Sequence, residues 1–160
     1  MGRPGAGPAV VIRRLGPSDT SVLATLARDD GDFGMDEERG PQTPLDDAAA
    51  RAHLDDPRVL HWAAFAGEAV VGFVFCLVLP MRKQPARELL LYDIGVREAW
   101  RRQGVGRRLI AAMTAWMAAE AVETAWVLAG DDEAARFYEA CGFRPGAEPP
   151  TYLELRRSPG

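Results

Sequence analysis

The chain contains little cysteine and little histidine. Its two cysteines, Cys76 within an apolar run and Cys141 beside Gly142, provide neither a disulfide framework nor the spacing of a metal site. Its two histidines, His53 and His61, have no evident catalytic partner along the sequence. We therefore expect a reduced, cytoplasmic protein without a metal centre, in which Cys141 and both histidines are structural.

Long hydrophobic runs and a net positive charge are also missing. Residues 1–8 lack the apolar core of a signal peptide, and no later segment is long and apolar enough to span a bilayer. Membrane association is therefore not expected. The formal net charge of −4 argues against a nucleic-acid partner bound through its phosphates. A local basic cluster is nevertheless present, at Arg101, Arg102, Arg107 and Arg108.

The apolar content is sufficient for one core. With 160 residues, of which 48% are hydrophobic, we expect a single domain over residues 9–157 that follows a flexible segment, residues 1–8. Helices are predicted from Asp19 with Ser18 as cap, from Pro44 to Asp55 with Thr43 as cap, after Gly104, and over 131–141. Strands are predicted over 9–15, 59–65, 69–79, 88–96, 124–129 and 152–156. This order predicts an α/β domain around a mixed sheet with a central hairpin.

A glycine-containing turn, residues 101–106, lies between an apolar strand and an amphipathic helix. Glycine lets the main chain approach a ligand closely, and the first N–H groups of a helix have no partners within the helix. Such a helix start favours an anion such as a pyrophosphate. The turn therefore predicts a phosphate site, although similar turns also close ordinary strand–helix connections.

Two separated segments carry a family resemblance. The first is the strand 91–96 followed by Arg101-x-x-Gly104-x-Gly106, and the second is Ala134-x-x-Phe137-Tyr138-x-x-x-Gly142-Phe143. Together they resemble the GCN5-related N-acetyltransferase (GNAT) superfamily. The resemblance implies the GNAT fold, a central mixed and mostly antiparallel sheet with a splayed strand pair and about four flanking helices. It also implies acetyl-coenzyme A (acetyl-CoA) as the acetyl donor.

The resemblance also implies how acetyl-CoA is bound. In the superfamily, the glycine turn binds the pyrophosphate, and the main chain of the bulged strand before it pairs with the pantetheine arm. The implied cofactor-binding residues are Ile94, Gly95, Val96, Arg101, Arg102, Gln103, Gly104, Val105, Gly106, Arg107, Asp131, Ala134 and Phe137. One of them departs from the family pattern, since Asp131 replaces an asparagine that often opens the second segment.

A closer resemblance is densest from Glu68 to Ile110. Glu68-Ala69-Val70-Val71-Gly72, Val78-Leu79-Pro80, Tyr92-Asp93 and Gly130-Asp131-Asp132 are similar to segments of the type I aminoglycoside 3-N-acetyltransferases of gentamicin resistance. This similarity implies acetylation of the 3-amino group of deoxystreptamine. Two alternatives stay open: an acetyltransferase for another amine, such as a polyamine, a small metabolite or a protein amino terminus, and a CoA-binding sensor without turnover. A homodimer is compatible with the sequence but is not specified by it.

Acetylation of an amine needs a proton acceptor, because a protonated amine has no lone pair. Many members of the superfamily use a glutamate at the position filled here by Leu90. The nearest replacements are Asp93 and Glu88, and period-two alternation puts Glu88 on the same face as Leu90 and Tyr92. A bulge near Asp93 would upset this count, so alternation does not choose between the two acids. We favour Asp93, next to the expected oxyanion donor at Ile94, with Glu88 as substrate ligand or alternative base.

A tyrosine and an acidic loop are the remaining candidates for roles in catalysis and in acceptor binding. The resemblance places the Tyr138 phenol near the thiol, where it could protonate the departing thiolate; the alternative is a packed helix tyrosine. The loop that contains Phe33, which we expect to be exposed, is rich in acids that would attract a polycation. The expected acceptor-binding residues are Tyr92, Asp29, Asp30 and Asp32, and Asp36, Glu37 and Glu38 extend the acidic run. The alternative is a solvated loop.

Overall fold

The computed structural model describes residues 8–35, 42–148 and 150–157. Two compact units are present, Met1–Leu128 and Ala129–Gly160. The single domain expected over residues 9–157 therefore remains a prediction. In chain order, the elements are β1 (Val10–Arg14), α1 (Thr20–Arg28), α2 (Asp47–Asp55), β2 (Val59–Ala66), β3 (Ala69–Pro80), β4 (Arg87–Val96), the 3-10 helix η2 (Glu98–Trp100), α3 (Val105–Ala119), β5 (Ala125–Trp126) and α4 (Asp132–Ala140).

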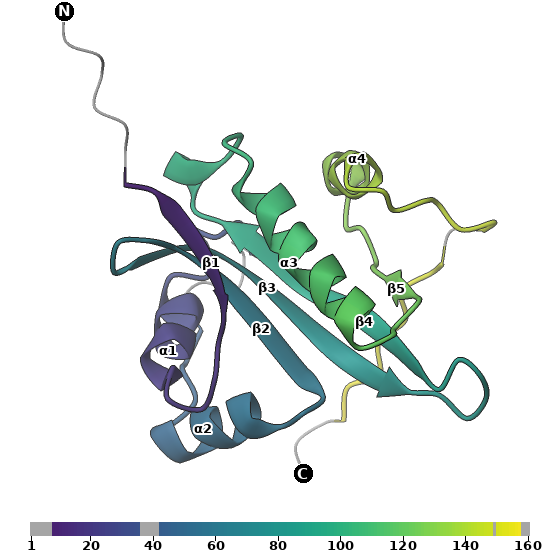
Figure 1. The fold of residues 1–160 in the computed structure, drawn as a ribbon, viewed down its shortest axis with the longest axis horizontal. Coiled ribbons are helices and arrows are strands. Elements are labelled where there is room, and N and C mark those ends of the chain that lie inside the picture. Colours follow the sequence, from purple (N-terminus) through teal and green to yellow (C-terminus); the bar gives the residue numbers. More distant parts are fainter. Residues whose placement is uncertain (1–7, 36–41, 149, 158–160) are drawn as a thin grey trace, which may run out of the picture. The chain divides into compact units, whose positions relative to one another are not determined.

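The first unit is built on one five-stranded sheet with the order β1-β2-β3-β4-β5 (Figure 1). The first four strands are antiparallel to their neighbours, and β5 is parallel to β4. β2 and β3 form the predicted hairpin around Gly67, whose φ of 62° suits a residue without a side chain. The expected mixed, mostly antiparallel GNAT sheet with its helices is thus confirmed.

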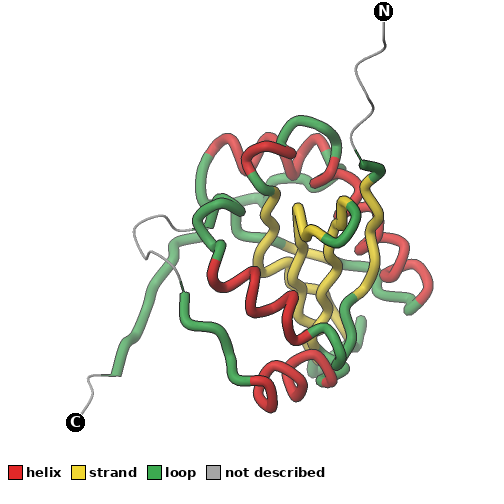
Figure 2. Tube along the Cα trace, turned by 90° about the vertical axis from the view of Figure 1, so that its left-hand side faces the viewer, coloured by secondary structure: helices red, strands yellow, loops and turns green. Residues whose placement is uncertain are grey.

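Helices cover both faces of this sheet, and they flank the strands in Figure 2. On one face, a Cβ added to Gly72 of β3 would lie 3.1 Å from the side chain of Val105 and 3.3 Å from that of Leu109, both in α3. On the other face, a buried cluster combines sheet residues with residues of α1, α2 and the loop between them: Leu15, Leu26, Phe33, Leu54, Ala63, Val70 and Phe73. Alternation along β3 therefore directs Phe73 and Phe75 toward α1 and α2.

Both predicted caps at the start of the chain are wrong. The N-cap of α1 is Asp19 rather than Ser18, and the Asp19 carboxylate accepts the Gly16 N–H at 2.8 Å while it pairs with Arg13. α2 begins at Asp47, because the Asp46 side chain accepts the Ala49 N–H at 2.8 Å and so satisfies one of the unpaired amides of the first turn.

Two predicted strands near the end of the chain also change. The strand expected over 124–129 is reduced to Ala125–Trp126, and residues 152–156 form no strand in the part of the chain that the structure describes. The apolar side chains of Tyr152, Leu153 and Leu155 are 77%, 86% and 97% exposed. A strand forms only where a partner edge supplies hydrogen bonds, and none of the described strands pairs with these residues.

Candidate active site

A bulge in β4 decides which side chains of this strand share a face. Phe75 of β3 pairs with Asp93, whereas its neighbour Cys76 pairs with Leu91, so Tyr92 is the extra residue. Residues directly opposite each other in a sheet point to the same face, and Asp93 therefore lies on the α1/α2 face with Phe75. Glu88, opposite Leu79, lies on this face as well. Both acids therefore share one face of the sheet, and the face alone does not distinguish them as the base.

The two acids nevertheless lie far apart along the strand. Asp93 lies five positions after Glu88, which corresponds to about 16 Å in an extended strand and somewhat less with a bulge. One amine cannot contact both carboxylates at this separation. Tyr92, beside Asp93, is 59% exposed and offers an aromatic surface next to that carboxylate.

β4 and β5 are paired over a short stretch only. β5 pairs with Leu89 and Leu90, and among the described residues no strand continues the pairing beyond them. The Arg97 N–H donates to the Val71 carbonyl oxygen on β3, whereas the Val96 carbonyl oxygen accepts from Arg101 on the opposite side. The main-chain N–H and C=O groups of successive strand residues point to opposite edges of the strand. The Ile94 N–H therefore points the same way as the Val96 carbonyl oxygen, to the edge of β4 away from β3, which we call the open edge. This geometry is the splayed strand pair expected from the sequence.

The glycine turn forms the start of α3. Gly104 is its N-cap residue in the left-handed conformation, with a φ of 79°, and no side chain caps the helix. The Arg108 N–H donates to the Gly104 carbonyl oxygen at 3.1 Å, so the amides of the three preceding residues have no acceptor within the helix. The first turn contains no acidic residue. These features fit an anionic group such as a pyrophosphate.

Two side chains of the turn donate to carbonyl oxygens of neighbouring segments. Arg101 Nε donates to the Val96 carbonyl oxygen at 2.9 Å, and an Arg101 terminal nitrogen donates to the Asp32 carbonyl oxygen at 3.2 Å. Gln103 donates to the Ala99 carbonyl oxygen at 3.0 Å. Arg102 and Arg107 are exposed, and Arg102 has a positive φ of 60°. The predicted phosphate contact of Arg101 therefore competes with an internal role, in which this side chain joins the turn to the loop after α1.

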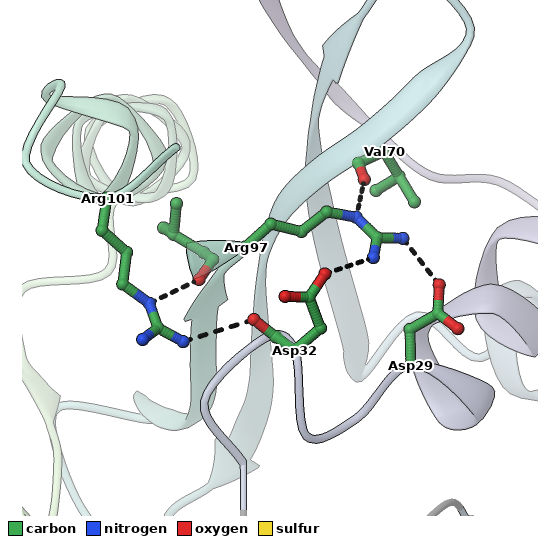
Figure 3. Close-up of polar contacts among 6 residues, drawn as sticks. Asp29, Asp32, Val70, Arg97 and Arg101 are labelled. Atoms are coloured by element: carbon green, nitrogen blue, oxygen red, sulfur yellow. Dashed lines mark hydrogen bonds and ion pairs between the residues drawn. The ribbon is translucent and has the colours of Figure 1, made fainter. Parts of the chain in front are cut away.

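A residue that sequence reasoning missed, Arg97, organises the acidic loop (Figure 3). Its two terminal nitrogens pair with Asp29 and Asp32, each at 2.7 Å, and its Nε donates to the Val70 carbonyl oxygen at 2.7 Å. The guanidinium also lies 4.4 Å from the centre of the Phe33 ring. Since one arginine is shared by two carboxylates, the three side chains together carry a net charge of about −1. No local sequence pattern indicates this arrangement.

The loop after α1 packs against the end of β4. Phe33 is 1% exposed, so the expectation that it is exposed was wrong; its ring stacks edge-on against Phe73. A Cβ on Gly95 would lie 2.6 Å from the Phe33 carbonyl oxygen and 2.8 Å from the Phe73 ring. Only glycine fits such a close approach. The remaining members of the acidic run, Asp36, Glu37 and Glu38, lie outside the described residues.

We predict that Arg97→Met destabilises the first unit by about 1–2 kcal/mol, because two partly exposed carboxylates and a carbonyl oxygen lose a charged donor. Urea unfolding monitored by tryptophan fluorescence measures this change. The matched control is Arg82→Met, at an exposed arginine in the loop between β3 and β4, which should leave the free energy of unfolding unchanged. Equal values for the two variants would show that the Arg97 contacts contribute nothing.

The second unit contains the predicted aromatic pair. The Asp131 carboxylate caps α4 by accepting the Ala134 N–H at 2.8 Å, so both of these residues have a local structural role. Gly142 has a φ of 100°, which confirms the left-handed residue predicted after this helix. Tyr138 is buried, and its ring centre lies 5.4 Å from that of Phe137 and 5.5 Å from that of Phe143. Its position beside a thiol remains a prediction.

The two histidines are in contact with each other, a pairing that the sequence did not indicate. The Nε2 atoms of His53 and His61 lie 3.0 Å apart, and burial lowers the pKa of His61 to about 3. Burial also raises the pKa of the Cys76 thiol to about 12, so Cys76 is not a thiolate nucleophile at neutral pH. The described residues contain no group of three or more side chains suited to a metal ion. No helix among them is both long and apolar enough to cross a membrane.

Comparison with solved structures places the fold among acetyltransferases. An aminoglycoside acetyltransferase from an uncultured soil metagenomic sample, in complex with sisomicin, is 21% identical with a TM-score of 0.78, covering 92% of this chain and 97% of its own. The aminoglycoside N-acetyltransferase AAC(6')-Iy in complex with CoA is 18% identical with a TM-score of 0.68, covering 96% and 98%. Ribosomal-protein-alanine N-acetyltransferase from Brucella melitensis biovar Abortus 2308 is 20% identical with a TM-score of 0.70, covering 93% and 100%. No curated protein matches the chain.

A family model also matches the sequence directly. The model of the acetyltransferase (GNAT) family covers residues 25–143, a range that includes the bulged strand, the glycine turn and the aromatic pair. Members of this family use acetyl-CoA, and the open edge of β4 and the uncapped start of α3 are the features that suit its pantetheine and pyrophosphate groups. The chain belongs to the GNAT family and is an acetyl-CoA-dependent N-acetyltransferase.

Proposed function

We propose that the protein transfers the acetyl group to the 3-amino group of deoxystreptamine in an aminoglycoside antibiotic, and thereby confers resistance. The observation that carries the proposal is the bulge at Tyr92, which puts Asp93 and an exposed aromatic ring side by side at the point where β4 leaves β5. Support for the substrate class comes from the segments between Glu68 and Ile110 that resemble type I 3-N-acetyltransferases, and from the fold shared with an enzyme solved with sisomicin.

In the proposed site, acetyl-CoA is bound mostly by main-chain groups of the protein. Acetyl-CoA supplies the acetyl group as an activated thioester. The amides of Val105, Gly106 and Arg107 at the start of α3 would bind its pyrophosphate, and the open edge of β4 at Ile94, Gly95 and Val96 would pair with pantetheine. The Ile94 N–H would polarise the carbonyl group, a contribution of about 10²–10³ in rate for a preorganised donor. For the second unit, the family resemblance implies cofactor contacts at Asp131, Ala134 and Phe137, and these stay predictions.

On the acceptor side, we propose Asp93 as the general base. It is the carboxylate beside the open edge and next to Ile94. Glu88 lies near the other end of β4, just before the residues that pair with β5, and is left as a substrate ligand. Tyr138 is proposed as the acid that protonates the departing thiolate. The free thiols are not needed in this scheme, because the amine attacks the acetyl group directly.

The acidic loop would attract a polycationic acceptor less strongly than its sequence indicates. Asp29 and Asp32 share Arg97, so their combined field is close to that of a single carboxylate. We propose that this remaining charge and Asp30 steer the acceptor electrostatically, while Tyr92 supplies direct contact. Such steering weakens as salt increases.

Another amine is the second candidate. The fold is shared with a ribosomal-protein-alanine N-acetyltransferase, and that enzyme's name indicates a protein amino terminus as acceptor. Product analysis separates the candidates. Mass spectrometry of a reaction with gentamicin should show addition of one acetyl group, and NMR should place it on the 3-amino nitrogen. A product acetylated at another position would refute the regiochemistry, and acetylation of alanine peptides alone would favour the second candidate.

The pyrophosphate site is tested at Gly104. A valine there would be strained at the φ of 79°, so the change of choice is Gly104→Asn, because asparagine tolerates the left-handed conformation. A Cβ at this position meets open space, and the protein should fold. We expect the added side chain to raise the KM for acetyl-CoA by about tenfold while the KM for the amine stays unchanged. Gly67→Asn, in the β2–β3 hairpin with a φ of 62°, is the matched control; equal cofactor affinity in both variants would contradict the assignment.

A further inference from the structure

Four ring side chains form a continuous row across the α1/α2 face of the sheet. The ring centres of His53 in α2 and His61 in β2 are 5.2 Å apart, and His61 stacks on Phe75 in β3 at 4.3 Å with an interplanar angle of 2°. Phe75 in turn contacts Tyr92 at the β4 bulge, with ring centres 5.4 Å apart. The row begins in α2 with His53 and ends at the exposed aromatic ring of Tyr92 beside Asp93.

The register of the strands makes this row a property of the fold. His61 lies directly opposite Phe75, and Phe75 lies directly opposite Asp93. Strand spacing puts His61 roughly 10 Å from Asp93, too far for direct contact with a substrate held there. Any influence of His61 on the acceptor must therefore pass through Phe75 and Tyr92.

His61 is a polar residue at a buried position that an apolar ring could fill. His61 is 6% exposed, and its Nδ1 has no hydrogen-bond partner among the residues that the structure describes. Such a buried, unpartnered nitrogen costs free energy that an apolar ring of similar size would avoid. Its Nε2 lies 3.0 Å from His53 Nε2, and such a bond needs a proton on one nitrogen and a lone pair on the other. The pair therefore fixes the His61 ring with respect to α2, and with it the ring stacked on its face.

We propose that His61 is a positioning residue of the acceptor site. Through Phe75, it holds the Tyr92 ring in place as a platform. A saturated, ammonium-bearing ring of the acceptor packs against this platform while Asp93 accepts the proton. This inference rests on the proposed function. Aromatic faces attract ammonium groups and also pack against the C–H face of a saturated ring. The platform therefore selects cyclic polyamines over linear ones of the same charge.

A double-mutant cycle tests whether His61 acts through Tyr92. With sisomicin as acceptor, His61→Leu should raise the KM for sisomicin by about tenfold and leave the KM for acetyl-CoA unchanged. His61→Phe keeps a ring for stacking and should restore most of the affinity. Tyr92→Ala should also raise the KM for sisomicin, and adding His61→Leu to it should produce no further increase. Thermal unfolding of each variant confirms that it is folded.

Two measurements keep the test decisive. If His61→Leu does not fold, His53→Phe removes the same hydrogen bond from the half-buried end of the pair. This variant keeps a ring next to Phe75, whose ring centre lies 5.6 Å from that of His53, and it should raise the KM for sisomicin by a smaller factor. Since the chain contains two histidines only, NMR of the ring nitrogens should show one ring protonated at Nε2 and the other at Nδ1. Effects of His61→Leu and Tyr92→Ala that multiply would overturn the inference alone. A wild-type protein that acetylates no aminoglycoside would overturn the proposed function as well.

Discussion

Asp93→Asn is expected to reduce kcat by about 10²–10⁴-fold, because the amide cannot accept the proton that the amine must lose. The change preserves shape and hydrogen-bonding capacity on the face beside Tyr92, so binding of acetyl-CoA should survive. The acidic limb of the pH–rate profile should disappear along with most of the activity. Steady-state kinetics across pH, with cofactor binding measured separately by calorimetry, provides both readouts.

Glu88→Gln is the matched control for this change. Both acids lie on the same face of β4, but the distance along the strand keeps Glu88 away from an amine held at Asp93. Glu88→Gln should alter the KM for the acceptor at most. If Asp93→Asn is close to wild type and Glu88→Gln is inactive, the two roles are reversed. If neither variant loses activity, the proton acceptor is water or the substrate itself.

Tyr138→Phe is expected to lower kcat by about 10²-fold, since general acid catalysis of thiolate departure is lost together with the hydroxyl group. The alkaline limb of the pH–rate profile should change, and acceptor binding should be kept. The phenyl ring preserves the contacts with Phe137 and Phe143, which limits the effect on folding. The rate of CoA release, followed with a thiol reagent, measures the change.

A control at the other ring beside Tyr138 separates chemistry from packing. Phe143→Leu removes a neighbouring ring and leaves the Tyr138 hydroxyl in place. A drop in kcat that is equal in the two variants would assign Tyr138 a packing role. A pH profile that is unchanged in Tyr138→Phe would lead to the same conclusion.

The regular elements of the sheet followed from the sequence. Hydrophobic runs with turn residues between them predicted β2, β3 and β4 to within a residue or two of their ends, because burial on both faces leaves such runs few alternatives. Helix starts were less accurate. Ser18 and Thr43 are good capping residues, but Asp19 and Asp46 are equally good, and the loops that precede the helices decide which one is used.

The charged part of the candidate site could not be predicted from local patterns. Arg97 lies 65 positions from Asp32 and 68 from Asp29, and no rule of spacing connects residues that far apart. The same limit explains why Phe33 was expected to be exposed. A single aromatic residue between acids resembles a surface loop, but the close approach to Gly95 buries it.

The face of the sheet on which Asp93 lies could not be predicted from the sequence, because it depends on the position of the bulge at Tyr92. The family motif predicts a bulged strand before the glycine turn, but a shift of one residue moves a side chain to the opposite face. The observed register assigns Asp93 to the face of Tyr92 and Phe75. It also connects the bulge to the His53–His61 pair, which has no signature in the sequence.

The most direct measurement is release of CoA from acetyl-CoA by the purified protein against a panel of amines that contains gentamicin, sisomicin, spermidine and an alanine peptide. The predicted result is a kcat/KM for the aminoglycosides at least tenfold above that for the other amines, a difference of about 1.4 kcal/mol in transition-state stabilisation. Turnover confined to spermidine or the peptide, or binding of acetyl-CoA without turnover of any amine, would contradict the proposed function.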